Sequence, residues 1–330
     1  MNPPVKANCF QRVNVIKFSN KEINSVKTDL SKTASQLAKV ADGEVQTDRL
    51  LAPYTSYKIG GPAAVWVAPG TESAVGRVIK VIHDNNLPFI VLGRGSNLLI
   101  SDSGWNGVAL YLGQNLSGFS FAGNQAIVSA GTLLMDLVQA ATQKGLGGME
   151  LLAGIPGGVG GALRMNAGAF GQEIEGTTEA VSGFRYDGTP FEAGRQTITF
   201  NYRRVPELDD VVITSARFRF KAATPSELRA RVADILALRN KKQPLEHPSC
   251  GSVFKRPAGY YAGALIEEAG LKGERIGGAM ISPKHAGFIL NTKNARAADV
   301  YALVRLVEKT VWKRFGVRLE REVKLIGDFD

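Results

Sequence analysis

The chain contains few of the residues that build disulfide frameworks, metal sites and membrane spans. Its two cysteines, Cys9 and Cys250, are too few and too far apart for a disulfide framework, and such sparse usage is typical of a reducing compartment. Its three histidines lack the spacing of metal ligands. No apolar run reaches membrane-spanning length, and the N-terminal residues contain no hydrophobic block of the signal-peptide type. We therefore expect a cytoplasmic protein with no metal site and no insertion into a membrane.

Two further absences concern nucleotides and nucleic acids. The motif G-x-x-x-x-G-K-[ST] does not occur, which argues against an NTPase. The formal net charge of +10 suits nucleic acid, an anionic membrane surface or phosphorylated small ligands. However, the basic residues are scattered or lie in residues 1–40, and they are not interleaved with aromatics as in nucleic-acid-binding proteins. A nucleic-acid partner is therefore disfavoured, and residues 1–45 are expected to form a basic, flexible leader.

Glycine, in contrast, is concentrated in one segment. Residues 145–171 hold ten of the 37 glycines, and the residues between them are largely apolar rather than polar as in a disordered linker. Glycine allows positive φ angles and a close approach of the backbone to a ligand. Successive backbone N–H groups at such turns bind phosphate or pyrophosphate. Tight turns in a β-rich domain are the alternative, but a second glycine turn at residues 93–97 directly follows an expected strand and favours a nucleotide cradle.

Apolar periodicity divides the rest of the chain into helices and strands. We expect helices from Thr71 to Asn85, from Thr132 to Lys144, from Pro225 to about Arg239 and from Ala297 to Phe315. The third of these starts at Thr224-Pro225-Ser226-Glu227, which predicts an N-cap with a capping box. We expect strands at residues 65–68, 89–92, 108–112, 126–129, 180–186, 197–202, 211–220, 252–254, 287–290 and 317–326.

Few residues stand out as catalytic from spacing alone. Ser252 follows a glycine but lacks the G-x-S-x-G pattern of hydrolases, so a turn serine is the first interpretation. Cys250 has no paired base and is typical of small buried packing. Arg203 follows Tyr202 at the end of an expected strand. Glu322 alternates onto the charged face of the last expected strand, which indicates a solvated face.

Nine short segments nevertheless occur in a specific order between about residues 50 and 326. They are residues 54–62 (YTSYKIGGP), 93–97 (GRGSN), 154–161 (GIPGGVGG), 165–171 (MNAGAFG), 202–203 (YR), 251–255 (GSVFK), 270–273 (GLKG), 277–279 (GGA) and 322–327 (EVKLIG). Any one of them could arise by chance, but the ordered set is highly specific. It resembles the UDP-N-acetylenolpyruvoylglucosamine reductases, flavoenzymes of peptidoglycan precursor synthesis, over most of the chain.

This resemblance implies an α+β fold in which a two-part FAD-binding unit of the vanillyl-alcohol-oxidase type precedes a C-terminal α+β substrate-binding domain. We assign residues 46–106 and 107–223 to the two FAD-binding subdomains. Residues 224–330 are assigned to the substrate domain, whose last strand returns to the active site. The implied cofactors are FAD and NADPH. The implied reaction reduces UDP-N-acetylglucosamine enolpyruvate to UDP-N-acetylmuramate, with hydride passing from the flavin to the vinyl carbon C3 and negative charge building on C2 and the carboxylate.

The resemblance also implies roles for particular residues. Ser252 would donate the proton to C2, and Arg203 and Glu322 would act at the substrate carboxylate. The expected flavin contacts are Gly93, Gly95, Ser96, Asn97, Gly154, Ile155, Pro156, Gly157, Gly160, Gly161, Asn166 and Gly168. The expected substrate contacts are Tyr202, Lys255, Arg256, Lys272 and His285.

Two departures from the family's pattern bear on these contacts. Arg256 stands where asparagine is common after Phe-Lys, and Gly158 stands where threonine is frequent. The short stretch after Arg203 leaves no room for the tyrosine-loop insertion of one subgroup, so the chain resembles the shorter subgroup. A sugar or alcohol oxidase of the same fold is the alternative enzyme, but the segments around Ser252 and Glu322 favour the reductase. We expect a monomer.

Overall fold

A four-stranded mixed sheet forms the first part of the chain in the computed structural model, which describes residues 30–329. Its order is β1 (Glu44–Leu50), β2 (Pro62–Ala68), β5 (Trp105–Tyr111) and β3 (Phe89–Leu92), with β1 antiparallel to β2 and the other pairs parallel. Helix α3 (Glu72–Asp84) connects β2 to β3. It begins at Thr71, whose hydroxyl oxygen accepts the Ala74 N–H at 3.2 Å, and it buries its apolar face as the sequence predicts.

The expectation of a flexible leader over residues 1–45 is wrong for its described portion. Residues Leu30–Val40 form helix α2. Leu37 and Ala41 are fully buried against α3 and the first sheet. These two residues are one helical turn apart, and the stripe they make is too short to detect by periodicity. The rest of the expected leader, residues 1–29, lies outside the described residues.

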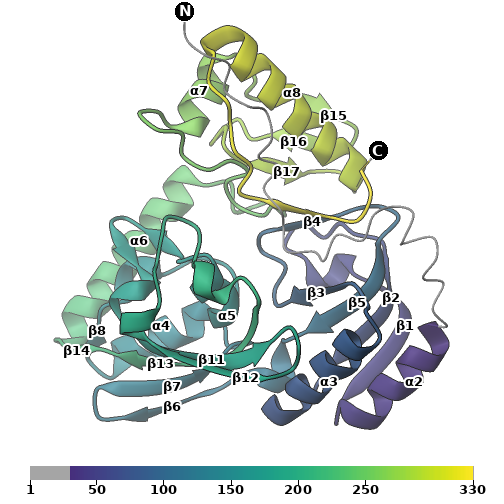
Figure 1. Cartoon of the computed structure of the whole chain (residues 1–330). Helices are drawn as coiled ribbons and strands as arrows, with labels where there is room; N and C mark the ends of the chain where they lie inside the picture. The colour runs from purple at the N-terminus through teal and green to yellow at the C-terminus, as the bar shows by residue number, and fades with distance from the viewer. Residues whose placement is uncertain (1–29, 330) are drawn as a thin grey trace, which may run out of the picture.

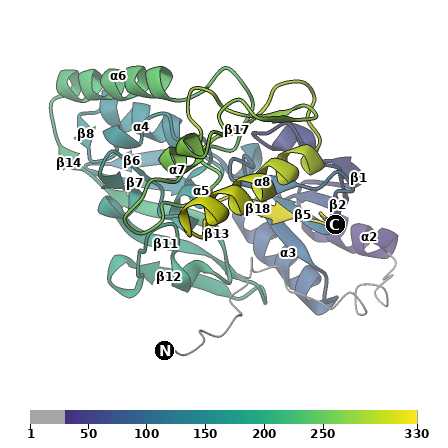
Figure 2. The same cartoon turned by 90° about the horizontal axis from the view of Figure 1, so that it is seen from above.

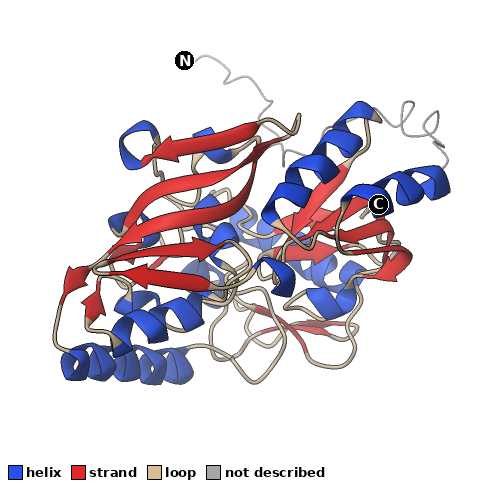
Figure 3. Ribbon diagram, turned by 90° about the horizontal axis from the view of Figure 1, so that it is seen from below, coloured by secondary structure: helices blue, strands red, loops and turns tan. Residues whose placement is uncertain are grey.

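A five-stranded antiparallel sheet forms the second part and lies beside the first sheet (Figure 3). Its order is β12 (Pro190–Gly194), β11 (Thr178–Arg185), β13 (Val211–Arg219), β7 (Gln125–Ser129) and β6 (Phe119–Ala122). Helices α4 (Leu134–Gln143), α5 (Val159–Arg164) and α6 (Pro225–Lys242) lie on one side of this sheet (Figure 1). Their apolar faces and the inward-facing strand residues form one core, which includes Leu137, Val159 and Ile235.

Two local predictions in the second part are wrong. Residues 197–202 do not form a strand, because the chain makes a 3-10 turn at Arg195–Thr197 and Asn201 pairs with Arg204 across a tight turn. The φ of +57° at Arg203, within that turn, is incompatible with a continuous strand. The capping box at the start of α6 is also absent, since the Thr224 side chain makes no capping hydrogen bond.

The third part packs two helices against a small antiparallel sheet. The helices are α7 (Ala262–Glu268) and α8 (Ala297–Phe315), and the strands are β15 (Arg275–Ile276), β16 (Ala279–Ile281) and β17 (Ile289–Asn291). Helix α8 matches its sequence prediction at both ends, and Gly316 ends it with a left-handed φ of +68°. Figures 1 and 2 show this part lying over the junction of the other two. The Asp102 carboxylate of the first part accepts the N–H groups of Ala297 and Ala298 at 2.8 and 3.1 Å, so it caps α8 and fixes its position.

The last strand returns to the first part, but it is shorter than the sequence predicts. β18 (Lys324–Ile326) pairs in parallel with β4 (Leu98–Ile100). Residues 317–323 do not continue β18, although a strand is expected over residues 317–326. Arg321 instead makes an isolated bridge with Phe254 and an ion pair with Glu308 of α8, and these contacts replace strand pairing there.

Two expected domain boundaries cut through packed elements. The boundary between residues 106 and 107 falls inside β5, all of which belongs to the first sheet. Helix α6 was assigned with residues 224–330, yet Val232 and Ile235 bury it in the core of the second part. A helix belongs with the core that buries its apolar face. The third part therefore begins after α6.

Two short strand pairs complete the described structure. They are β9 (Gly168–Ala169) with β10 (Gln172–Glu173), and β8 (Leu146–Gly147) with β14 (Lys221–Ala222). None of the helices between residues 30 and 329 is long and apolar enough to cross a membrane. In the same portion of the chain, no three His, Cys, Asp or Glu side chains are grouped so that they could hold a metal ion.

The burial of α2 gives a stability prediction. Leu37→Ala removes a fully buried side chain and leaves a cavity, so we expect it to lower the free energy of unfolding by about 2–5 kcal/mol. Lys39→Gln, at an exposed position of the same helix, should change it by less than about 0.5 kcal/mol. Urea unfolding followed by circular dichroism measures both values. Equally small effects of the two substitutions would show that α2 is not part of the folded core.

Candidate active site

A cleft of about 2140 Å³ opens where the three parts meet. Its walls come from both glycine turns, the turn at residues 201–204, the C-terminal end of α6, and loops of the third part at residues 247–256 and 284–288. Small-molecule pockets usually enclose about 300–1,000 Å³. This cleft is therefore large enough to hold a dinucleotide and a second ligand together.

The two glycine turns meet in one wall of the cleft. Gly93 and Gly161 face open space, because a Cβ added at either position would touch nothing within 4 Å. Gly95 and Gly157 have φ angles of +55° and +127°, and a Cβ at Gly157 would come within 2.8 Å of Ser96 Oγ. The turns thus pack together while their backbones remain open to a ligand, an arrangement that favours glycine. This cradle fits the extended diphosphate of FAD.

Eleven of the twelve expected flavin contacts line the cleft. They are Gly93, Gly95, Ser96, Asn97, Gly154, Ile155, Pro156, Gly157, Gly160, Gly161 and Gly168. The twelfth, Asn166, is only 1% exposed and does not line it. Its Nδ2 donates to Glu173 Oε2 at 2.8 Å and to the Asn201 carbonyl at 3.4 Å. Its Nδ2 thus holds the turn at residues 201–204, whereas its buried Oδ1 has no hydrogen-bond partner among residues 30–329, and the flavin contact at Asn166 stays a prediction.

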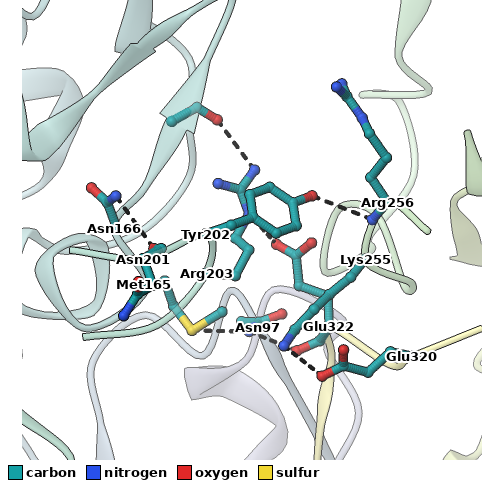
Figure 4. A network of polar contacts seen from close by, with 11 residues as sticks. Asn97, Met165, Asn166, Asn201, Tyr202, Arg203, Lys255, Arg256, Glu320 and Glu322 are labelled. Atoms are coloured by element: carbon teal, nitrogen blue, oxygen red, sulfur yellow. Dashed lines mark hydrogen bonds and ion pairs between the residues drawn. The ribbon is translucent and has the colours of Figure 1, made fainter. Parts of the chain in front are cut away.

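Arg203 and Glu322 meet in the cleft (Figure 4). Arg203 Nε donates to Glu322 Oε1 at 2.9 Å, and its Nη2 donates to the Gly168 carbonyl at 3.3 Å. The positive φ of Arg203 is uncommon for a residue with a side chain. Such conformations cluster at functional sites, where the surrounding structure maintains them. The turn thereby brings a guanidinium of the second part to a carboxylate of the third.

The backbone of Glu322 is held from two sides. Its N–H donates to the Val253 carbonyl at 2.8 Å, and its own carbonyl accepts from Asn97 Nδ2 at 3.0 Å. Desolvation raises the pKa of the Glu322 carboxyl above its ordinary value, and the Arg203 guanidinium opposes that rise. The interpretation of Glu322 as part of a solvated face is wrong, because the pairing of β18 with β4 carries it into the cleft.

Ser252 lines the same cleft as Arg203 and Glu322. The N–H of the next residue, Val253, donates to the Gly287 carbonyl at 2.9 Å, and the Val253 carbonyl accepts the N–H of Glu322. Segment 251–255 is therefore fixed between two neighbouring stretches of the third part. The structure brings together the three residues that the sequence resemblance places at the reaction, although they lie far apart along the chain.

Four of the five expected substrate contacts line the cleft, namely Tyr202, Lys255, Arg256 and His285. Tyr202 Oη accepts the Arg256 N–H at 3.3 Å, so it bridges the second and third parts (Figure 4). Lys255 Nζ pairs with Glu320 at 2.6 Å. Burial lowers the pKa of His285, which favours a neutral imidazole.

The fifth expected substrate contact, Lys272, does not line the cleft. Its ammonium pairs with Glu267 Oε1 at 2.6 Å, and Glu267 is the member of this pair that lines the cleft. The charge of Lys272 is thus already balanced by a carboxylate on α7, and the substrate contact at Lys272 stays a prediction.

Several cations that line the cleft have no ligand contact predicted from the sequence. They are Arg164, Arg239, Lys242, Lys284 and Lys324. Arg239 continues the helical spacing of the buried apolar residues of α6, so a charge at an apolar position was a signal for it. Lys324 is two residues from Glu322, a spacing that places both side chains on one side of an extended chain. Desolvation and the charge of Lys255 lower the pKa of Lys324.

The fold and the cleft define a class of protein, the flavin-dependent oxidoreductases. A family model described as an FAD binding domain matches residues 62–183. A second model, described as the C-terminal domain of UDP-N-acetylenolpyruvoylglucosamine reductase, matches residues 243–326. This second match begins directly after α6, where the third part begins in the structure.

Whole-chain relatives identify the family. The chain is 43% identical over 289 residues to UDP-N-acetylenolpyruvoylglucosamine reductase 2 of Bacillus cereus, covering 87% of this chain and 94% of the relative. It is 41% identical over 296 residues to the reductase of Oceanobacillus iheyensis, covering 89% and 96%. The crystal structure of the Thermus caldophilus reductase matches with a TM-score of 0.75 at 37% identity, covering 86% of this chain and 99% of that one.

The chain belongs to the UDP-N-acetylenolpyruvoylglucosamine reductase family and is an FAD-dependent oxidoreductase. The sequence resemblance is thus confirmed, together with the α+β fold and its FAD-binding unit. The same matches decide against the oxidase alternative.

The raised pKa of Glu322 gives a pH prediction. The folded chain keeps the Glu322 proton to a higher pH than the ordinary value of 4.5, so above that pH it binds more protons than the unfolded chain. The stability of the wild-type chain relative to Glu322→Gln should therefore fall as the pH rises from about 4.5. Urea unfolding of both proteins between about pH 4 and pH 7 measures this difference. A relative stability that increases over the same range would contradict a carboxyl group whose desolvation outweighs its ion pair.

Proposed function

We propose that Arg203, Ser252 and Glu322 carry out the family's reaction in this cleft, the NADPH-dependent reduction of UDP-N-acetylglucosamine enolpyruvate to UDP-N-acetylmuramate. The main support is the 2.9 Å contact between Arg203 Nε and Glu322 Oε1, in a cleft that Ser252 and both glycine turns also line. Bound FAD supplies a hydride, received from NADPH, at the vinyl carbon of the substrate. Negative charge then develops on the neighbouring carbon and its carboxylate, so the protein must supply a cation and a proton.

Arg203 supplies the cation. A guanidinium holds a carboxylate through two parallel hydrogen bonds and stabilises it as its charge increases. Glu322 already occupies the Nε edge of this guanidinium, so the substrate carboxylate and Glu322 share one positive charge. Arg203 is also the group that lowers the pKa of Glu322 most. Binding of the substrate carboxylate therefore raises that pKa and favours an uncharged Glu322, which does not repel the developing anion.

Ser252 supplies the proton. Segment 251–255 is fixed by backbone hydrogen bonds, one of them to Glu322, so the hydroxyl donor and the carboxylate site keep a constant spacing. A hydroxyl is a weak acid in water, but Arg203 and Lys324 line the same cleft, and positive charge stabilises the alkoxide left after donation. Glu322, once protonated, provides a source from which the Ser252 proton is replaced.

The UDP-sugar is assigned to the part of the cleft lined by Tyr202, Lys255, Arg256 and His285. These residues offer cations and hydrogen-bond donors for phosphate and sugar oxygens. Sparse cysteine usage and the water-soluble substrates support a cytoplasmic location. The positive charge of the cleft serves these anionic ligands rather than a nucleic acid.

Stopped-flow absorbance of the flavin separates the two half-reactions and so tests the role of Ser252. Ser252→Ala should leave flavin reduction by NADPH within about twofold of wild type, because that step needs no proton donor for the substrate. The same variant should slow flavin reoxidation by the enolpyruvyl sugar by about 100-fold or more. Ser120→Ala, at an exposed position of β6, is the matched control and should leave both rates unchanged.

Two results would contradict this account at different levels. An equal loss of both half-reactions in Ser252→Ala would exclude the donor role of Ser252. A purified chain without a flavin spectrum, or NADPH oxidation that does not depend on the enolpyruvyl sugar, would contradict the reaction itself.

A further inference from the structure

Arg239, in the last turns of α6, is a buried cation with an incomplete set of partners. Only 6% of its surface is exposed. Its Nη1 donates to Gln243 Oε1 at 3.4 Å, and its buried Nε has no hydrogen-bond partner among residues 30–329. Burial lowers the pKa of the guanidinium, and no carboxylate in the described part of the chain opposes that effect. The protein therefore holds a positive charge out of water without neutralising it.

The side chain of Arg239 is nevertheless held in a defined place. Gly154 makes room for it, because a Cβ at Gly154 would lie 2.8 Å from Arg239 Cδ. The guanidinium carbon lies 5.5 Å from the centre of the Phe170 ring. A buried charge without a partner destabilises a folded protein. Its presence at an apolar position of α6 indicates that a partner of opposite charge comes from outside the chain.

The cleft is the side from which that partner comes. Arg239, Lys242 and Gln243 line it together with Gly154 and residues 155–158. The glycine turn offers backbone N–H groups but no charge, whereas the end of α6 offers two cations. Guanidinium groups pair well with phosphate oxygens. The enolpyruvyl carboxylate is assigned to Arg203, so it does not fill this role.

We propose that Arg239 is the counter-cation of a diphosphate that binds between the C-terminal end of α6 and the turn at residues 154–158. This inference rests on the proposed function. When the reduced flavin reacts with the enolpyruvyl sugar, the two ligands in the cleft that carry a diphosphate are FAD and the UDP-sugar. The contact of Arg239 with Gly154, in one of the open glycine turns, favours the diphosphate of FAD. In either case the ligand supplies the missing negative charge.

Two substitutions separate ligand binding from a structural role. Arg239→Met keeps the carbon stem and removes the charge, and Arg239→Lys keeps the charge without the planar donors. Arg229→Gln, at an exposed position of the same helix, is the matched control. Each full-length flavoprotein is stripped of FAD and titrated with FAD at low and high salt, with binding followed by flavin fluorescence. The apoprotein melting temperature is recorded, and KM for the enolpyruvyl UDP-sugar is measured at saturating FAD.

Arg239→Met should raise the FAD dissociation constant by about 10- to 100-fold, the effect of losing a charge-assisted hydrogen bond, and should reduce its dependence on salt. Arg239→Lys should give an intermediate value, and Arg229→Gln should match wild type. The Arg239→Met apoprotein should melt at the wild-type temperature or above it, because an uncompensated buried charge has been removed. A residue with only a structural role would lower that temperature when replaced.

The remaining outcomes also decide the matter. If FAD affinity is unchanged and KM for the UDP-sugar rises about tenfold, the diphosphate is that of the substrate and the proposal stands. If neither quantity changes, or if the loss of binding accompanies a destabilised apoprotein, the proposal is overturned. A wild-type chain that takes up no FAD would contradict the proposed function instead, so the two failures are distinguishable.

Discussion

The contact between Arg203 and Glu322 joins the second and third parts of the molecule in the cleft where we propose that the reaction occurs. Each partner depends on structure far from it in sequence. The position of Arg203 depends on the turn at residues 201–204, which Asn166 holds through a hydrogen bond to the Asn201 carbonyl. The position of Glu322 depends on the pairing of β18 with β4. The pair is largely removed from water, so each side chain is stabilised mainly by the opposite charge of the other. A third charge placed beside the pair would therefore alter this balance. A substrate carboxylate bound at Arg203, as proposed, is such a third charge, and we expect its arrival to change the protonation of the site.

Arg203 and Arg239 line the same cleft but differ in their partners within the protein. At the Arg203 end, we propose that one cation is shared between a protein carboxylate and the enolpyruvyl carboxylate. At the Arg239 end, a cation without a protein partner lies beside a glycine turn that supplies only backbone donors. We therefore expect the Arg203 end to change its charge state on binding and the Arg239 end to keep its charge. This difference suits a reacting group at one end and a diphosphate, which keeps its charge, at the other.

Local sequence patterns predicted the elements that local interactions determine. The limits of α3 and α8 followed from apolar spacing and from residues at their ends, namely Thr71 and Gly316. The positive φ of Arg203 and the burial of Glu322 could not be predicted that way, because they depend on pairing between distant segments. The family resemblance found both residues but does not give side-chain direction, and two residues that it associates with ligands, Asn166 and Lys272, do not line the cleft. Arg239 had a local signal in the sequence, because it is a charged residue at a helix position whose spacing predicts an apolar side chain.

The central claim is that a ligand carboxylate on Arg203 leaves Glu322 uncharged. Calorimetric titration of the oxidised flavoprotein with UDP-N-acetylmuramate, in buffers of different ionisation enthalpy, measures the protons taken up on binding. At neutral pH the wild-type chain should take up protons on binding, and Glu322→Gln should take up fewer. Binding of the carboxylate ligand to the wild-type chain without proton uptake, or with the same uptake in the variant, would contradict the account.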